Sequence, residues 1–418
     1  MNIDENVRIH KMKFNFVDFH VLTASLILCS IGILMVFSIT GTYIFNNRMG
    51  DRLGYMTHSI TGFFLGLALM ALATIFPNKW FRGRFGLAIV IFTLGLLILT
   101  PLVGIDVPSS PGVYRWIRIP GVITFQAVDL ARIGFTISVP WIVKHLIEKK
   151  IFYTKKIWSY YVVPLFFVVI CAGLIIAQPD LGSAIVIAIT GFIIFFSSGI
   201  HKIQIYFLVF VGIGFLVFGL IFGHTVLLGY QANRIAAWLD PFSHPFGLQT
   251  TMGFVSIALG GWTGVGIGNS SQTLGFAIEA HTDMIITIVS EELGVLWVLA
   301  IMGLYLLIAT KCFLTALKST DEFNALVCIG VGSFFLAQPF VNLAGVIGLI
   351  PLSGITLPFI SHGMTSMVST FVLIGLYFNM RRQILVDHEK EKIIRNRENN
   401  KQTANGNASK IIPFKTVG

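Results

Sequence analysis

The stretch YQANRIAAWLDPFSHPFG at 230–247, followed by GGWTGVGIGNSSQTLGFAIEAHTDMIITIVSEELG at 260–294, belongs to the longest part of the chain without a clean membrane-spanning run. Among its ionisable side chains five are singled out here, and two adjacent glutamates follow them in the next apolar segment. Only 11% of all residues in the protein are charged. Because charges in or beside a membrane are costly, this concentration predicts a functional site. The side chains concerned are Arg234, Asp240, Glu279, His281 and Asp283, followed by Glu291 and Glu292.

Outside this stretch the chain is strongly apolar. Its 418 residues are 55% hydrophobic, with a mean hydropathy of +0.82. Apolar runs long enough to cross a bilayer recur along the sequence, without the alternating pattern of a β-barrel. The sequence therefore predicts an all-α polytopic membrane protein of about ten helices, with a long extracellular loop at 229–283 between the seventh and the eighth. The expected spans are 19–45, 53–76, 86–104, 122–147, 160–178, 183–200, 204–228, 284–309, 324–350 and 362–380.

The formal charge of +10 reflects membrane topology rather than nucleic-acid binding. Six of the 29 Lys and Arg residues fall on one side of the expected topology or in its outer half, and 23 fall on the other side. By the positive-inside rule the second side is cytoplasmic, and the even number of spans places both termini there. The expected organisation is a cytoplasmic segment at 1–18, a membrane domain at 19–385, and a disordered basic cytoplasmic tail at 386–418.

Asp283 is predicted to lie at the start of the eighth helix, where the helix dipole favours an ionised carboxylate. It can be a simple N-terminal helix acid, a general base, or a ligand of a divalent cation. Glu291 and Glu292 lie deeper in the same expected helix, and Glu292 points away from Asp283 at helical spacing. Glu292 and Asp283 therefore cannot form a simple carboxylate dyad, and for both glutamates we favour a role as anchors between neighbouring helices.

Other polar residues in the expected spans and loops allow two interpretations each. Asp129 and Arg132 at i, i+3 can form a self-neutralising pair, or Arg132 can bind a phosphate. Arg115 can also bind a phosphate, or it can extend toward lipid headgroups. Asp180 is placed to cap a helix. His281 and His362 are more typical of helix ends than of ligands, and the cysteines have the pattern of small core residues rather than of a metal site.

Several motifs, in this order, resemble the SEDS family, the FtsW, RodA and SpoVE polymerases of bacterial cell-wall synthesis. The resemblance covers about 15–385. The matching segments are RWI at 115–117, QPDLGSA at 178–184, YQANRIAAWLDP at 230–241, GVGIGNSSQTLGF at 264–276, EAHTDM at 279–284, SEELG at 290–294 and GLIPLSGITLPFISHGMTS at 348–366.

The resemblance implies a ten-helix peptidoglycan glycosyltransferase in the bacterial cytoplasmic membrane. Such an enzyme polymerises lipid II at the outer leaflet, releases undecaprenyl diphosphate, and works with a class B penicillin-binding protein and other divisome or elongasome membrane proteins. The family's catalytic acid matches Asp283, and a divalent cation, Mg²⁺ or Mn²⁺, is allowed there but not required. The residues expected to contact substrate are Arg115, Trp116, Gln126, Asp129, Arg132, Asp180, Arg234, Glu279, His281, Ser361 and His362.

The start of the fourth span departs from the family pattern. The family usually has QPSE followed by a Lys, whereas this chain reads QAVDLAR at 126–132. Near the tenth span the usual Gly-Gly is Gly363-Met364, preceded by His362. These changes suggest a divergent paralogue. They leave open two alternatives to a polymerase, namely a lipid-II flippase and a catalytically weak scaffold of the cell-wall synthesis complex.

Overall fold

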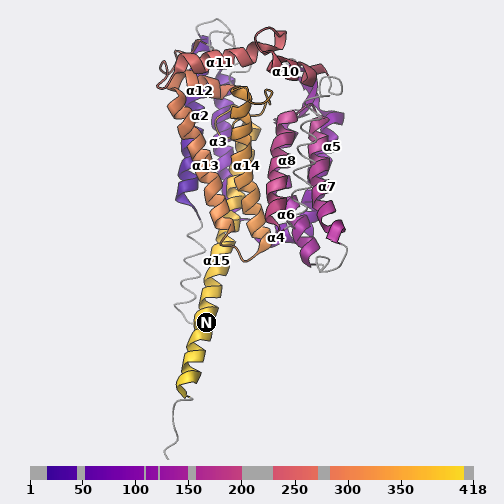
Figure 1. The fold of residues 1–418 in the computed structure, drawn as a ribbon, viewed down its shortest axis with the longest axis vertical. Coiled ribbons are helices and arrows are strands. Elements are labelled where there is room, and N and C mark those ends of the chain that lie inside the picture. Colours follow the sequence, from indigo (N-terminus) through magenta and orange to yellow (C-terminus); the bar gives the residue numbers. More distant parts are fainter. Residues whose placement is uncertain are drawn as a thin grey trace, which may run out of the picture.

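The computed structural model describes residues 17–44, 52–107, 110–120, 123–148, 157–199, 229–271 and 283–408. Figure 1 shows long helices running side by side, with the short helices α10–α12 across one end and α15 extending beyond the other. Five of these helices are long and apolar enough to cross a membrane. The helical, polytopic membrane architecture is therefore confirmed, whereas the number of ten spans stays a prediction. The seventh expected span, at 204–228, lies outside the described residues.

In the first half of the chain the described residues form six long helices and a small sheet. The helices are α2 (Phe19–Ile44), α3 (Arg52–Ile75), α5 (Arg84–Val103), α6 (Ala127–Glu148), α7 (Ile157–Ile176) and α8 (Leu181–Ser197), and the five-residue helix α4 (Asn78–Arg82) joins α3 to α5. The second half contains α10 (Gly229–Leu239), the 3-10 turn η2 (Pro245–Gly247), α11 (Leu248–Gly260), α12 (Ile285–Leu293), α13 (Val295–Ala316), α14 (Glu322–Val346) and α15 (Met364–Ala408).

The connection expected to be a loop at 105–121 is a three-stranded antiparallel sheet. Its strands are β1 (Ile105–Val107), β2 (Ser110–Ile119) and β3 (Ile123–Gln126), in the order β1-β2-β3. Trp116 in the central strand pairs with Ile105 on one side and Gln126 on the other. Because β3 takes up 123–126, the fourth span begins at Ala127 and not near 122.

The expected eighth span at 284–309 is two helices rather than one. α12 ends at Leu293, and α13 begins at Val295 after Gly294, which has a φ of 88°. A Cβ atom at Gly294 would lie 2.3 Å from the main-chain oxygen of Trp262. The loop after α11 thus crosses the chain at this point, and only glycine allows both the backbone conformation and the close approach.

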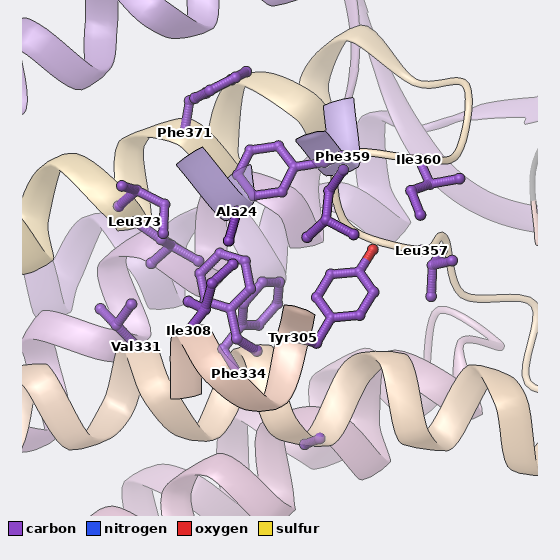
Figure 2. Packing of buried hydrophobic residues seen from close by; sticks show 14 of the residues in the cluster. Ala24, Tyr305, Ile308, Val331, Phe334, Leu357, Phe359, Ile360, Phe371 and Leu373 are labelled. Atoms are coloured by element: carbon purple, nitrogen blue, oxygen red, sulfur yellow. The ribbon is translucent and has the colours of Figure 1, made fainter. Parts of the chain in front are cut away.

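The main hydrophobic core joins α2 to the C-terminal helices. Most of its buried side chains come from α2, α12, α13, α14, α15 and the segment 347–363, which follows α14. Figure 2 shows Tyr305 of α13 beside Phe359 and Leu357 of that segment. The Tyr305 hydroxyl donates a hydrogen bond to the main-chain oxygen of Pro358. The segment 347–363 is therefore held by packing against buried aromatic side chains of the core.

Ion pairs connect helices at the other end of the bundle, away from the short helices α10–α12. Arg381 Nε lies 3.8 Å from Asp18 Oδ2, which places the start of α2 beside the middle of α15. Asp321, the N-cap of α14, pairs with Arg82 at 3.0 Å and with Lys144 at 3.7 Å. The helix α15 continues to Ala408. The polar part of α15 after residue 386 forms its backbone hydrogen bonds within the helix, so it needs no partner in the bundle to satisfy them.

Candidate functional site

Asp283 lies two residues before α12 and is buried, with 6% of its surface exposed. Its main-chain oxygen accepts a hydrogen bond from Asn342 Nδ2 at 2.9 Å. The same amide nitrogen lies 2.8 Å from the main-chain oxygen of Ile355. Asn342 therefore links the chain at Asp283 to the segment 347–363.

Three further donors bind main-chain oxygens of the segment 347–363. Arg234 Nη1, on α10, donates to Leu352 O at 2.7 Å, and Trp238 Nε1 donates to Gly348 O at 2.8 Å. Gln338 Nε2 donates to Thr356 O. Gln338 and Asn342 of α14 thus both reach backbone oxygens of a segment in which Pro351 and Gly354 interrupt helical hydrogen bonding.

A second set of expected site residues meets at the junction of the sheet with α6 and α8. Arg115 of β2 donates to Gln178 O at 3.3 Å and to Pro179 O. Gln126 Nε2 lies 3.4 Å from Asp180 Oδ2. Asp180 caps α8, as its position predicted, since its Oδ1 accepts from Ser183 N at 3.1 Å. Trp116 is half-buried in the strand that carries Arg115.

Asp129 and Arg132 form a buried ion pair on α6, with 1% and 2% of their surfaces exposed. Asp129 Oδ1 and Arg132 Nη1 are 2.9 Å apart. Thr365 Oγ1, from the start of α15, donates to Asp129 Oδ2 at 3.1 Å, and Arg132 Nη2 donates to Ser183 Oγ at 3.3 Å. The pair is thus self-neutralising and connects α6 to α15 and α8.

Thr365 and Ser183 were not among the expected site residues. Both lie inside matching motifs of the sequence, at 348–366 and 178–184, but their partners come from a different helix far along the chain. Their position inside these motifs was the signal in the sequence that could have identified them. Only the fold shows which charges these hydroxyl groups contact.

The remaining expected residues differ in their surroundings. Ser361 is buried and its hydroxyl accepts a hydrogen bond from Leu357 N at 2.6 Å, so it closes a local turn. His362 Nδ1 lies 3.0 Å from Ser59 Oγ on α3. Glu279 and His281 lie outside the described residues. Within the described ranges, no three His, Cys, Asp or Glu side chains lie close enough to share a metal ion.

Glu292, in the last turn of α12, is a buried carboxylate whose pKa is shifted by its surroundings. Burial raises the pKa of Glu292 above its ordinary value. The hydroxyl of Ser38 and the backbone N–H groups of Gly268 and Ser270 oppose this rise by stabilising the charge, whereas the neighbouring Glu291 adds to it. The carboxylate is therefore held in place by donors despite an unfavourable site.

Fold and site together define a polytopic helical membrane protein whose short surface helices, small sheet and irregular segment collect polar side chains at one end. The chain belongs to the FtsW/RodA/SpoVE family, because the family model described as "Cell cycle protein" matches residues 19–384.

The curated relatives include proteins named "Probable peptidoglycan glycosyltransferase FtsW". That of Pseudoalteromonas translucida is 32% identical over 369 residues, covering 86% of this chain and 88% of the relative. That of Geobacter sulfurreducens is 27% identical and covers 92% of this chain and 99% of the relative.

Solved structures share the fold. A chain from the structure named "Structural coordination of polymerization and crosslinking by a peptidoglycan synthase complex" has a TM-score of 0.69 at 24% identity, covering 88% of this chain and 98% of that one. The rod shape determining protein RodA of Thermus thermophilus has a TM-score of 0.62 at 20% identity, covering 88% of this chain and 97% of that one.

Proposed function

We propose that this peptidoglycan glycosyltransferase polymerises lipid II into glycan strands at the outer face of the bacterial cytoplasmic membrane, with Asp283 as general base. The observation that supports this proposal best is the placement of Asp283. Its backbone is fixed by Asn342 at the start of a short buried helix, at the end of the bundle that also holds Arg234 and the segment 347–363. A general base needs a fixed position beside the proton that it accepts.

The reaction assigned to this site is a glycosyl transfer. The C4 hydroxyl of an acceptor GlcNAc attacks the anomeric carbon of a donor MurNAc, and the bond to undecaprenyl diphosphate breaks. Asp283 takes the hydroxyl proton, and the electron pair of the breaking bond stays on the diphosphate. A carboxylate near the start of a helix is stabilised in its charged form, which suits a base at neutral pH.

The leaving diphosphate requires positive charge, which Arg115 and Arg234 can supply. Arg115 is half-buried and bonds to two main-chain carbonyl groups, which do not cancel its charge. Arg132, in contrast, is neutralised by Asp129, so we assign that pair to supporting the sheet and α15 rather than to direct contact with phosphate. Where a divalent cation, Mg²⁺ or Mn²⁺, binds, the carboxylate of Asp283 would hold it, and the ion would offset negative charge on the leaving diphosphate.

The distribution of charges supports the proposed orientation. By the positive-inside rule we assign the end that carries Arg82, Lys144 and Arg381 to the cytoplasm, and Asp283 to the outer face. The natural partner is a class B penicillin-binding protein that cross-links the new strands, within the membrane proteins of a divisome or elongasome. Family membership supports this partner, and so does the similarity to a chain of a peptidoglycan synthase complex.

The test is polymerisation of labelled lipid II by purified protein, with and without its transpeptidase partner. We expect wild type to make glycan strands and Asp283→Ala and Asp283→Asn to lose at least about a hundredfold in rate, the typical size of a general-base effect. Glycan chains made equally by all three proteins would remove Asp283 from this role. A parallel assay of lipid II translocation in liposomes separates a polymerase from a flippase.

A further inference from the structure

The helix α12 connects the catalytic aspartate to two adjacent buried carboxylates. Asp283 precedes its first residue, Ile285, and Glu291 and Glu292 lie in its last turn. All residues from 285 to 292 are buried. The nine residues span about 13 Å at ~1.5 Å per residue, so a shift of one end of this short rigid element moves the other.

Glu291 is hydrogen-bonded to the loop that follows α11. Its Oε2 accepts from Ser270 Oγ at 2.7 Å. Its Oε1 accepts from Ser271 N at 2.8 Å and from Ser271 Oγ at 2.6 Å. Only 1% of the surface of Glu291 is exposed. A carboxylate only accepts, and so it matches three donors that point toward it.

Glu292 is bonded in a different direction, to the first membrane helix. Ser38 Oγ on α2 lies 2.8 Å from both carboxylate oxygens of Glu292. The backbone N–H groups of Gly268 and Ser270 bind the same carboxylate. The two neighbouring side chains therefore tie one end of α12 to a surface loop and to a long core helix at the same time.

Main-chain contacts tighten this junction. Val265 N donates to Glu291 O at 2.9 Å, and Gly266 N donates to Glu292 O at 3.0 Å. A Cβ atom at Gly264 would lie 2.2 Å from Glu292 O, and one at Gly260 would lie 2.0 Å from Ser290 O. The backbones touch without room for side chains, so the end of α12 has little freedom to shift.

We infer that Glu291 and Glu292 are positioning residues, which set the place of Asp283 by anchoring the opposite end of α12. This inference rests on the proposed role of Asp283. Two acids in the last turn of a helix act against the helix dipole, which favours cations there. Their placement is unfavourable for the helix alone, and it is offset by donors from the loop and from α2. A misplacement of about 1 Å in a catalytic group costs roughly a hundredfold in rate.

The test measures kcat and KM for lipid II polymerisation by the full-length protein with its partner. Glu291→Gln keeps the size of the side chain but replaces one accepting oxygen by an NH₂ group, which cannot accept the hydrogen bonds from Ser270 or Ser271. We expect kcat to fall roughly 10- to 100-fold while KM for lipid II stays within about twofold, the pattern of a lost transition-state geometry. The control is Asp321→Asn at the opposite end of the bundle, which removes a carboxylate bonded to Arg82 and lowers thermal stability while kcat stays within about twofold.

A second variant tests the inference without changing the carboxylate. Ser270→Ala with Ser271→Ala removes side-chain donors to Glu291 and is expected to lower kcat in the same manner. Adding Glu291→Gln to that variant is expected to cause less than the product of the two separate losses. If the double serine variant has the kcat of wild type, the inference is overturned. This outcome decides the question even if Glu291→Gln does not fold. If Asp283→Asn is inactive while the Glu291 and serine variants are fully active, only the positioning role fails. If Asp283→Asn is active, the proposed function fails instead.

Discussion

Asn342 binds the main-chain oxygen of Asp283 rather than its carboxylate, at a distance of 2.9 Å. A side-chain amide in the middle of α14 thus fixes the backbone of the proposed base while leaving the carboxylate to other contacts. Because Asn342 also bonds to Ile355 O at 2.8 Å, it couples that base to the irregular segment 347–363.

Replacing Asn342 with Ala is the first prediction. It leaves two buried carbonyl groups without this donor, so we expect a loss of about 2 kcal/mol in stability and of at least tenfold in kcat. The measurements are thermal unfolding in detergent and lipid II polymerisation. The matched control is Asn379→Ala, since Asn379 Nδ2 bonds to Ala73 O at 2.7 Å and Phe76 O at 2.6 Å near the other end. Equal losses of kcat in the two variants would contradict a specific role for Asn342.

The second prediction concerns the buried pair on α6. Asp129→Asn leaves the guanidinium of Arg132 buried without its counter-charge, and we expect a loss of about 3 kcal/mol or more in stability. The partly exposed pair Asp387–Lys390 has the same i, i+3 spacing at 3.7 Å, so Asp387→Asn is the control, with an expected loss below about 1 kcal/mol. Thermal unfolding of both variants measures the difference. Similar losses of stability in the two variants would show that burial does not increase the cost of breaking this ion pair.

The third prediction follows from the break between α12 and α13. Gly294→Ala places a Cβ atom at a φ of 88° and 2.3 Å from Trp262 O. We expect a loss of about 2 kcal/mol or more in stability, together with weaker polymerase activity. Gly303→Ala in α13 meets nothing within 4 Å and is expected to be neutral or slightly stabilising. A stable Gly294→Ala protein would mean that the loop after α11 can move away without cost.

The fourth prediction is a pH dependence at Glu292. Burial raises the pKa of Glu292 in the folded state, so the fold favours the protonated form relative to the unfolded chain. Its favourable contribution is complete below the unfolded pKa, about 4.3, and is lost as pH rises through the folded value. Glu292→Gln remains neutral, and its stability relative to wild type should therefore increase as pH rises from about 4 to 8.

Thermal unfolding of wild type and Glu292→Gln across this range tests the sign of the effect. The exposed Glu322, in the first turn of α14, gives the control variant Glu322→Gln. A stability difference for Glu292→Gln that falls with rising pH would contradict a raised pKa for Glu292 in the folded protein.

The sequence predicted the parts of the fold that depend on local pattern. Long apolar runs predicted the helical membrane architecture, the i, i+3 spacing predicted the Asp129–Arg132 pair, and the position after Pro179 predicted the cap by Asp180. These features depend on neighbours in the chain, and hydropathy and helix geometry are enough to find them.

The parts that were missed depend on contacts between distant segments. The apolar segment after Asp283 has no local signal for a break at Gly294, because the reason is the loop at Trp262 crossing it. The sheet was hidden because a search for long apolar runs ignores the short alternating pattern of VYRWIRI at 113–119. The donors to the segment 347–363 lie on α10, α13 and α14, so their targets became visible only in the fold.

The donors that hold the segment 347–363 recognise backbone oxygens, which every amino acid presents in the same way. Arg234, Gln338 and Asn342 would make the same bonds whichever side chains stood at Leu352, Thr356 and Ile355. At the partly exposed positions Leu352 and Thr356 the hydrogen bonds therefore fix the path of the backbone without fixing the side chain. Substitutions at these two positions can change the surface of the segment while its buried side chains and its backbone hydrogen bonds keep the fold.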